Sequence, residues 1–283
     1  MVKLQYYCYY LILSSLLLGI SPKPVSGQQL LLEYTATVDS TVALSYMVQN
    51  KEGKILGKLN ADKQIPSASI IKIPLLFYLM EKVEKNELDL RETYELRKSD
   101  KVGGSGELQF IPDGNLITYA YLASEMIRIS DNTATNILIR KVGLKPFQEW
   151  LITNGYKATQ LNRFMMDFDA ITKGHQNYTS AAEMNKLLLS LLNEKSLNKG
   201  STLQVLEWME NCEDNSALPN LLPEGVAIAH KTGTLEYVRG DAGIIFGKQP
   251  IVVTVFIAHY SNLMNADSII AEIARLAYLD FVE

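Results

Sequence analysis

The chain has 283 residues, of which 47% are hydrophobic and 20% are charged. This is an ordinary globular composition, long enough for a sizeable core in one compact unit or two intertwined lobes. The formal net charge of −4 is small, and the sequence contains no basic block or arginine-rich stripe. The charge pattern therefore argues against nucleic acid as a partner.

Residues 1–27 are predicted to be a secretory signal peptide. A short cationic start, "MVK", precedes an apolar segment and a breaker-rich exit, with small residues before a cut at Gln28. The apolar run is too short to favour an anchor helix. Cleavage removes Lys3 and Lys23, which takes the formal net charge from −4 to −6. We therefore expect an exported protein, periplasmic or secreted, with one folded domain over residues 28–283 and no stable membrane insertion.

Cysteine usage fits this expectation. Cys8 leaves with the signal peptide, and the bulky tyrosines before it argue against lipid attachment there. Cys212 then stands alone in the mature chain. An intramolecular disulfide is therefore excluded, although export would permit one.

The predicted elements of the mature chain begin with strands. Residues 40–50 alternate in polarity, "KEGK" forms a turn, and residues 55–64 can return as the second strand of a hairpin. From Ser69 to Asn86 the apolar residues recur at helical spacing, and helical patterns then dominate. One later helix opens with a predicted capping box, Ser180 to Glu183.

The pattern then returns to strands, over residues 225–234, 240–247 and 251–260, and an amphipathic helix over 265–282 closes the chain. Strands at both ends with helices between them imply one sheet built from distant segments. We therefore predict an α/β fold, an α+β sandwich. Its mainly antiparallel five-stranded sheet comes from the N- and C-terminal segments. An all-helical lobe, roughly residues 69–212, is inserted into it.

Ser69 and Lys72 form the pattern S-x-x-K at the start of the predicted helix. Serine is a poor nucleophile without an adjacent base, and helical positions three apart share a face, so Lys72 can reach the Ser69 hydroxyl. Burial beside other cations can lower a lysine pKa, and a helix N-terminus favours developing negative charge. The alternative is an N-cap serine followed by a lysine that snorkels to solvent. Because the pattern also occurs by chance at Ser196, Ser69 needs companion motifs.

Two companion motifs follow in order. "SDN" stands at Ser130 to Asn132, and "KTG" stands at Lys231 to Gly233, followed by Thr234. The ordered trio is a motif set of serine enzymes that react with β-lactams. An N-cap cluster between two helices is the alternative for "SDN", and it is compatible with catalysis.

On these residues the chain resembles class A β-lactamases and related exported serine hydrolases. "GSGELQ", "MIRISDNTATNILI" and "HKTGTLEYVRGDAGIIFG" are each similar to that family, and the resemblance covers most of the mature chain. It implies an active site in the cleft between the sheet and the helical lobe. It also implies a monomer that acts on a small β-lactam or peptide-like substrate. No cofactor is expected, and no metal site, because the sequence lacks metal-ligand spacing of His, Cys and carboxylates.

The resemblance implies a role for each motif residue. Ser69 would be the nucleophile, Lys72 its base, and Ser130 the group that passes a proton to the leaving nitrogen. The expected substrate-binding residues are Asn132, Lys231, Thr232, Gly233 and Thr234.

Within that set, Asn132 would hold the substrate's side-chain amide, while Asp131 braces the loop. Lys231 and Thr232 would bind the substrate carboxylate, and Gly233 would let the strand approach closely.

The backbone N–H groups of Ser69 and Thr234 would form the oxyanion hole. His230 is assigned no role. Arg239 is expected to be a solvated surface residue rather than an additional cation beside the carboxylate site.

The chain departs from the family in one loop. Class A enzymes activate the deacylating water with a glutamate in the pattern R-x-E-x-x-L-N, whereas this chain reads "RFMMDFD" from Arg163 to Asp169. Met165 stands at the glutamate position and Asp169 at the asparagine position. We therefore predict intact acylation and slow deacylation, with Asp169 as the substitute catalytic base and Asp167 as a second candidate.

The leading hypothesis is an exported class A β-lactamase-like serine hydrolase that works through an acyl-enzyme. One alternative is a penicillin-binding, peptidase-like or esterase-like acyl-transfer enzyme on cell-wall or related substrates. Another is a sensor module that is acylated once and holds its ligand.

Overall fold

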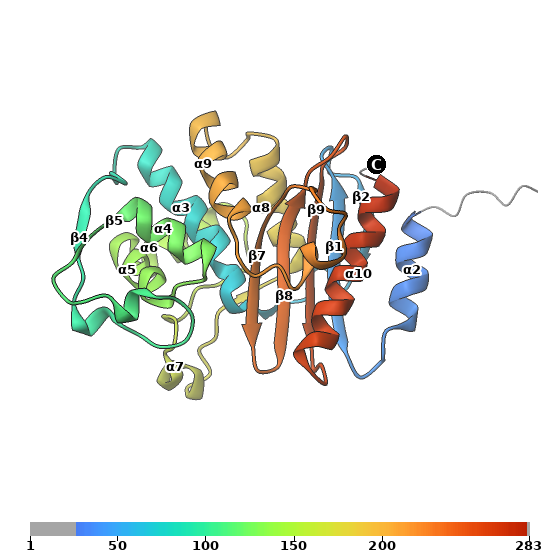
Figure 1. The fold of residues 1–283 in the computed structure, drawn as a ribbon, viewed down its shortest axis with the longest axis horizontal. Coiled ribbons are helices and arrows are strands. Elements are labelled where there is room, and N and C mark those ends of the chain that lie inside the picture. The colour runs from blue at the N-terminus through green and yellow to red at the C-terminus, as the bar shows by residue number, and fades with distance from the viewer. Residues whose placement is uncertain (1–26, 282–283) are drawn as a thin grey trace, which may run out of the picture.

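The computed structural model describes residues 27–281 (Figure 1). The predicted signal peptide lies outside these residues, apart from its last position. The main element is a five-stranded antiparallel sheet with strand order β2-β1-β9-β8-β7. Its two N-terminal strands lie beside strands from the far end of the chain, so the predicted fold class is confirmed. The strands are β1 (Ala43–Asn50), β2 (Ile55–Leu59), β7 (Ile228–Leu235), β8 (Val238–Ile245) and β9 (Ile251–Ala258).

Both faces of this sheet are covered. Every residue of β8 and nearly every residue of β9 is buried, which is why these strands read as continuous apolar runs. Successive side chains of a strand point to opposite faces. In β9, Val252 and Phe256 therefore join the core under the inserted helices, whereas Val253 and Val255 join a second core on the other face.

Two terminal helices cover that second face (Figure 1). The long helix α10 (Leu263–Phe281) was expected from its pattern, but α2 (Gly27–Thr37) was not. Both pack into the core that contains Leu31, Ile270 and Ile273. Within residues 27–281, no helix is long and apolar enough to cross a membrane.

The segment inserted between β2 and β7 is mainly helical. Within it, α8 packs against β1 and β9 and α9 packs against β7, so these two helices cover the sheet, and most of the others build the lobe beside it (Figure 1). Two short sheets also occur, β3 (Ile65–Pro66) with β6 (Tyr178–Thr179) and β4 (Thr93–Glu95) with β5 (Leu116–Thr118). The helices of the segment are α3 (Lys72–Glu84), α4 (Tyr119–Arg128), α5 (Asn132–Val142), α6 (Leu144–Thr153), α7 (Phe168–Thr172), α8 (Ala181–Leu192) and α9 (Lys199–Glu210).

The predicted capping box at α8 is half correct. The Ser180 side chain accepts a hydrogen bond from the Glu183 N–H, as an N-cap does. The Glu183 carboxylate accepts instead from the backbone N–H groups of Lys157, Ala158 and Thr159. It therefore anchors the start of the loop that carries the departure from the family pattern.

Candidate active site

Ser69 lies in a 3₁₀ turn, η1 (Ala68–Ile71), and α3 begins directly after it at Lys72. The first residues of the helix predicted from Ser69 to Asn86 therefore form a tighter turn, and the α-helix ends at Glu84, before Asn86. Residues three apart eclipse each other in a 3₁₀ turn, which keeps Ser69 and Lys72 on one face. Ala68 has a φ of +47°, an uncommon backbone conformation for a residue with a side chain, immediately before the predicted nucleophile.

Lys72 is fully buried and does not snorkel to solvent, which removes the alternative explanation for this lysine. Its Nζ donates to the Ser130 carbonyl at 2.7 Å, the Ser130 Oγ at 2.9 Å and the Asn132 Oδ1 at 3.1 Å. Burial lowers the pKa of Lys72 well below its usual value, and the charge of Lys231 lowers it further against the opposing effect of Asp131. These contacts bring the first two motifs together.

The S-D-N segment is held rigidly between α4 and α5. Asp131 is completely buried and caps α5, accepting from the Ala134 N–H at 2.8 Å, while its other oxygen accepts from the Leu108 N–H at 2.9 Å. Ser130 has a φ of +59°, a further strained position at the site. The cluster thus serves as a helix cap and at the same time presents Ser130 to Lys72.

The K-T-G segment lies on β7, the edge strand next to η1. Lys231 is 1% exposed, its Nζ donates to the Thr232 carbonyl at 3.1 Å, and burial lowers its pKa. A Cβ placed on Gly233 would lie 3.0 Å from the Ser69 backbone nitrogen. Only glycine lets the strand come this close to the nucleophile.

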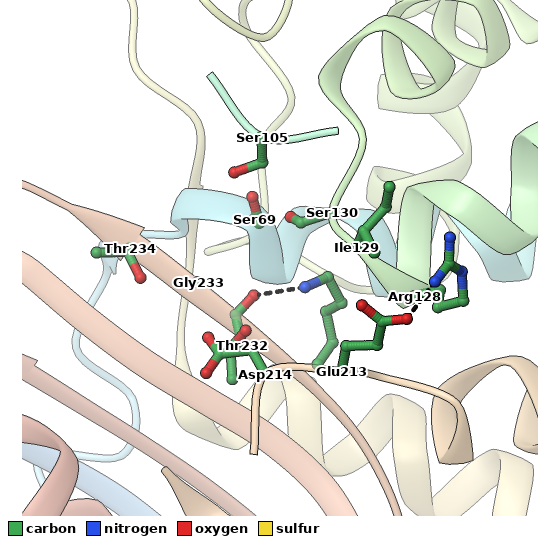
Figure 2. Close-up of a pocket in the computed structure, with 11 residues that line it drawn as sticks. Ser69, Ser105, Arg128, Ile129, Ser130, Glu213, Asp214, Thr232, Gly233 and Thr234 are labelled. Atoms are coloured by element: carbon green, nitrogen blue, oxygen red, sulfur yellow. Dashed lines mark hydrogen bonds and ion pairs between the residues drawn. The ribbon is translucent and has the colours of Figure 1, made fainter. Parts of the chain in front are cut away.

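These three motifs surround a cavity of about 360 Å³ (Figure 2). Ser69 and Ser130 lie beside each other in it, with Ser105 next to them (Figure 2). Sequence reasoning identified Ser69, Ser130, Lys231, Thr232, Gly233 and Thr234 as lining residues but missed Ser105, Arg128, Ile129, Glu213 and Asp214. Ser105, Arg128 and Ile129 lie in segments that resemble the family but were assigned no role. Glu213 and Asp214 lie outside those segments and outside the three motifs, so no local signal marked them.

A buried polar group lies behind the K-T-G strand. The His230 Nδ1 is 3.0 Å from the Asp241 Oδ2, and both side chains are almost fully buried. Burial works to lower the pKa of His230, but the charge and hydrogen bond of Asp241 outweigh it and raise the pKa to about 10. Asp241 also accepts from the Leu218 N–H at 3.0 Å, and Cys212 lies close enough to alter the pKa of His230. The contact between His230 and Asp241 thus ties β7 to β8 beside the K-T-G residues.

The expectation for Arg239 was wrong, because this residue is 2% exposed. Its guanidinium donates to the Asp267 Oδ1 at 2.6 Å, the Asp214 Oδ2 at 3.0 Å and the Thr234 Oγ1 at 2.7 Å. Carboxylate partners on two other segments compensate for its removal from water. Arg239 thus joins β8 to the start of α10 and to the loop that ends at Ser216.

A second cavity, of about 250 Å³, opens from Ser69 toward the divergent loop. Met165 is buried, and its backbone N–H and carbonyl both bond to the Asn136 side chain, at 2.8 and 3.1 Å. Within the described residues, the lining of this cavity includes no Asp or Glu. It comprises Ala68, Ser69, Gly104, Ser105, Asn132, Arg163, Met165, Met166, Phe168, Ile171, Thr234 and Leu235.

The two loop aspartates lie outside this lining. Asp169 is exposed on α7. Asp167 caps the same short helix, accepting from the Ala170 N–H at 2.9 Å. Of the predicted site residues, Ser69, Ser130, Asn132 and Lys231 to Thr234 line the Ser69 cavities, and the buried Lys72 contacts two of them, Ser130 and Asn132. Asp169 does neither. Among residues 27–281, no group of His, Cys, Asp and Glu side chains is arranged to hold a metal ion.

The fold and the three converging motifs define a class A β-lactamase-like serine enzyme. The chain belongs to the β-lactamase enzyme family, whose family model matches residues 32–281. Membership of this family implies a small-molecule substrate.

The chain is similar both to β-lactamases and to PBP-A. β-Lactamase VEB-1 of Pseudomonas aeruginosa is 27% identical over 247 residues, covering 81% of this chain and 82% of VEB-1. An ancestral class A β-lactamase superposes with a TM-score of 0.82 at 26% identity, covering 89% of this chain and 100% of that one. PBP-A superposes with a TM-score of 0.81 at 26% identity, over 89% of this chain and 94% of PBP-A, and a PBP-A mutant is known as its acyl-enzyme complex with penicillin G.

Proposed function

We propose that the protein is an exported serine enzyme that is acylated by β-lactams at Ser69 and hydrolyses the acyl-enzyme slowly. The observation that carries the acylation step is the buried Lys72 amine, 2.9 Å from the Ser130 hydroxyl and one turn from Ser69. The support from relatives is the penicillin G acyl-enzyme of the PBP-A mutant.

In the proposed reaction the Ser69 Oγ attacks the β-lactam carbonyl, and its proton passes to the Lys72 Nζ. The backbone N–H groups of Ser69 and Thr234 stabilise the oxyanion. When the ring C–N bond breaks, Ser130 donates its proton to the leaving nitrogen and is reprotonated from Lys72.

The contacts of Lys72 support this proton route. A neutral amine has two N–H donors and one lone pair. The Ser130 carbonyl and the Asn132 Oδ1 can only accept, and they use both donors. The third contact, in which the ammonium form donates to the Ser130 Oγ, is replaced in the neutral amine by a lone pair that can accept from a hydroxyl, either Ser130 or the incoming Ser69. The same nitrogen can therefore serve both serines in turn.

The proposed slow deacylation rests on the second cavity, whose described lining has methionine side chains and no carboxylate. A positioned general base is typically worth about 10²–10⁴-fold in rate, so its absence leaves the acyl group in place for longer. The exposed position of Asp169 gives it no direct part in this step. Its predicted role as a substitute base is therefore not carried into the proposal.

Two measurements test the proposal. Intact-mass analysis with a penicillin should give one drug-sized addition to the wild type and none to Ser69→Ala. A chromogenic cephalosporin should give a fast burst and a slow steady state. Equal labelling of Ser69→Ala would assign the nucleophile elsewhere.

The loop is tested by Met165→Glu with Met165→Gln as the matched control. The glutamate should raise the steady-state rate and leave the burst unchanged, because it supplies a carboxylate at the family position. The glutamine has the same size without a base and should not. A wild type with rapid turnover would contradict slow deacylation.

A penicillin-binding or peptidase-like acyl-transfer enzyme is the second candidate function. The lack of a carboxylate in the described lining of the second cavity favours it, as does the similarity to PBP-A. Turnover of peptide or ester substrates, with β-lactams acting only as slow inactivators, would select this function. Stoichiometric acylation with no turnover of any substrate would select the sensor module.

Export is proposed from the leader sequence alone. N-terminal sequencing of the mature protein should begin at Gln28 if the predicted cut is correct.

A further inference from the structure

One side chain in the Ser69 cavity belongs to none of the motifs and carries the wrong charge for the predicted substrate. Asp214 lines the cavity together with Lys231 and Thr232. Figure 2 shows Asp214 beside Thr232. The predicted role of Lys231 and Thr232 is to bind a substrate carboxylate. A carboxylate of the protein therefore lies at the part of the cavity where a carboxylate of the substrate is expected.

Asp214 is bound in the manner of a ligand carboxylate. Its Oδ2 accepts from Arg239 at 3.0 Å, and its Oδ1 accepts from the Ser216 hydroxyl at 2.6 Å. The Arg239 nitrogen that binds Asp214 also donates to the Thr234 hydroxyl at 2.7 Å, which joins this contact to the K-T-G strand. The Asp214 side chain remains 43% exposed, so it faces the cavity.

The charge of this carboxylate persists at neutral pH. Partial burial works to raise the pKa of Asp214, but hydrogen bonds from Ser216, Arg239 and Thr232 outweigh it and hold the pKa below its usual value. A substrate carboxylate at Thr232 would therefore meet a fixed anion. Two carboxylates that share one cavity repel each other, and the repulsion is stronger in a partly buried cavity than in open water.

We propose that Asp214 is a specificity-determining residue whose carboxylate occupies the substrate-carboxylate position, so that the cavity selects acyl donors with a neutral or cationic group there. The inference rests on the proposed acylation of Ser69 and deepens it by naming the substrate class. Acyl donors with an ester, amide or ammonium group beside the scissile bond fit this cavity, whereas those with a free carboxylate compete with Asp214.

The test compares two β-lactams that differ in one group, a penicillin and its methyl ester. The measured quantity is the second-order rate constant of acylation, followed by intact mass. In the wild type the ester should react at least as fast as the free acid. In Asp214→Asn the free acid should react roughly 10- to 100-fold faster than in the wild type, at about tenfold for each 1.4 kcal/mol of repulsion removed. The rate for the ester should stay unchanged.

Glu213→Gln is the matched control, because Glu213 lines the same cavity but pairs with Arg128. This variant should leave unchanged the ratio of the acylation rate constants for the free acid and the ester. An equal shift in both variants would assign the effect to the general charge of the cavity and overturn the proposal.

A second variant, Asp214→Ala, removes the side chain altogether. Formate should then slow acylation by the free acid competitively, because it fills the vacated position on Arg239, and it should have little effect on the wild type. Failure of formate to compete would contradict the proposal that the Asp214 carboxylate occupies the substrate-carboxylate position.

Different results would contradict the role of Asp214 and the acylation of Ser69. A wild type that is acylated while Asp214→Asn keeps the wild-type ratio overturns only the role of Asp214. A wild type that neither compound acylates overturns the proposed function, and this inference with it.

Discussion

Gly233→Ala is expected to slow acylation while leaving the protein folded. A Cβ at this position would lie 3.0 Å from the backbone nitrogen of Ser69, 3.1 Å from that of Ile70 and 3.0 Å from the Cβ of Ala68. Unstrained contacts between such atoms are about 3.5–4.0 Å, so β7 must move away from η1 by about half an ångström. β7 is the edge strand of the sheet, so its pairing with β8 and its packing against α9 resist this movement.

The movement separates the two proposed oxyanion donors, the N–H groups of Ser69 and Thr234. Loss of one such donor costs about 10²–10³-fold in rate, and a misplacement of about 1 Å costs about 10²-fold. A shift of about half that size should slow acylation by roughly 10- to 100-fold. Overpacking of this kind costs about 1–3 kcal/mol of stability, which lowers the melting temperature by a few degrees.

Stopped-flow acylation with a chromogenic cephalosporin measures the rate, and thermal unfolding monitors the fold. Gly103→Ala is the matched control, because a Cβ there meets nothing within 4 Å. It should retain the wild-type rate. A Gly233→Ala variant that is acylated as fast as the wild type would show that the close approach of β7 does not position the oxyanion donors.

Further predictions concern three buried charged residues. Lys72→Met should lower acylation by about 10²–10⁴-fold, the usual value of a positioned base, with only a small change in melting temperature. The wild-type acylation rate should itself fall as the pH drops through the lowered pKa of Lys72, because only the neutral amine can accept the proton. Asp131→Ala should cost about 2–4 kcal/mol in urea unfolding, because it removes a helix cap and orphans the buried Leu108 N–H. His230→Ala should cost about 3–5 kcal/mol near neutral pH, because it leaves Asp241 buried without its partner.

The His230 effect has a defined pH dependence. The folded-state pKa is about 10 and the ordinary value is 6.5, so the stabilisation is complete below about pH 6.5 and is lost as the pH rises through about 10. Urea unfolding of the wild type and the variant at pH 7 and pH 10 should show the difference shrinking. A constant difference would mean that His230 is neutral in the folded protein. For Lys72→Met, a large loss of stability would instead assign Lys72 a structural role.

The sequence predicted the fold class because its strongest patterns follow local rules. The continuous apolar run of β9 and the helical spacing after Ser69 come from burial, which acts on each segment along the chain. The sequence did not predict α2. Of the predicted capping box, only the Ser180 half forms. The Glu183 carboxylate serves the backbone of residues 157–159, which are distant in the chain, and no local pattern records such a contact.

The sequence by itself predicted which residues carry the chemistry, because S-x-x-K, S-D-N and K-T-G are each contiguous. Only the tertiary structure decided which charges surround them. The sequence pattern predicts Arg239 at the surface, yet in the structure it is buried and forms ion pairs with Asp267 and Asp214. Asp169 stands in the divergent loop and yet faces solvent, whereas Asp214, with no motif to mark it, lines the cavity. The physical reason is that electrostatic interactions depend on distance and burial in space, and these are set by the packing of segments that the sequence keeps far apart.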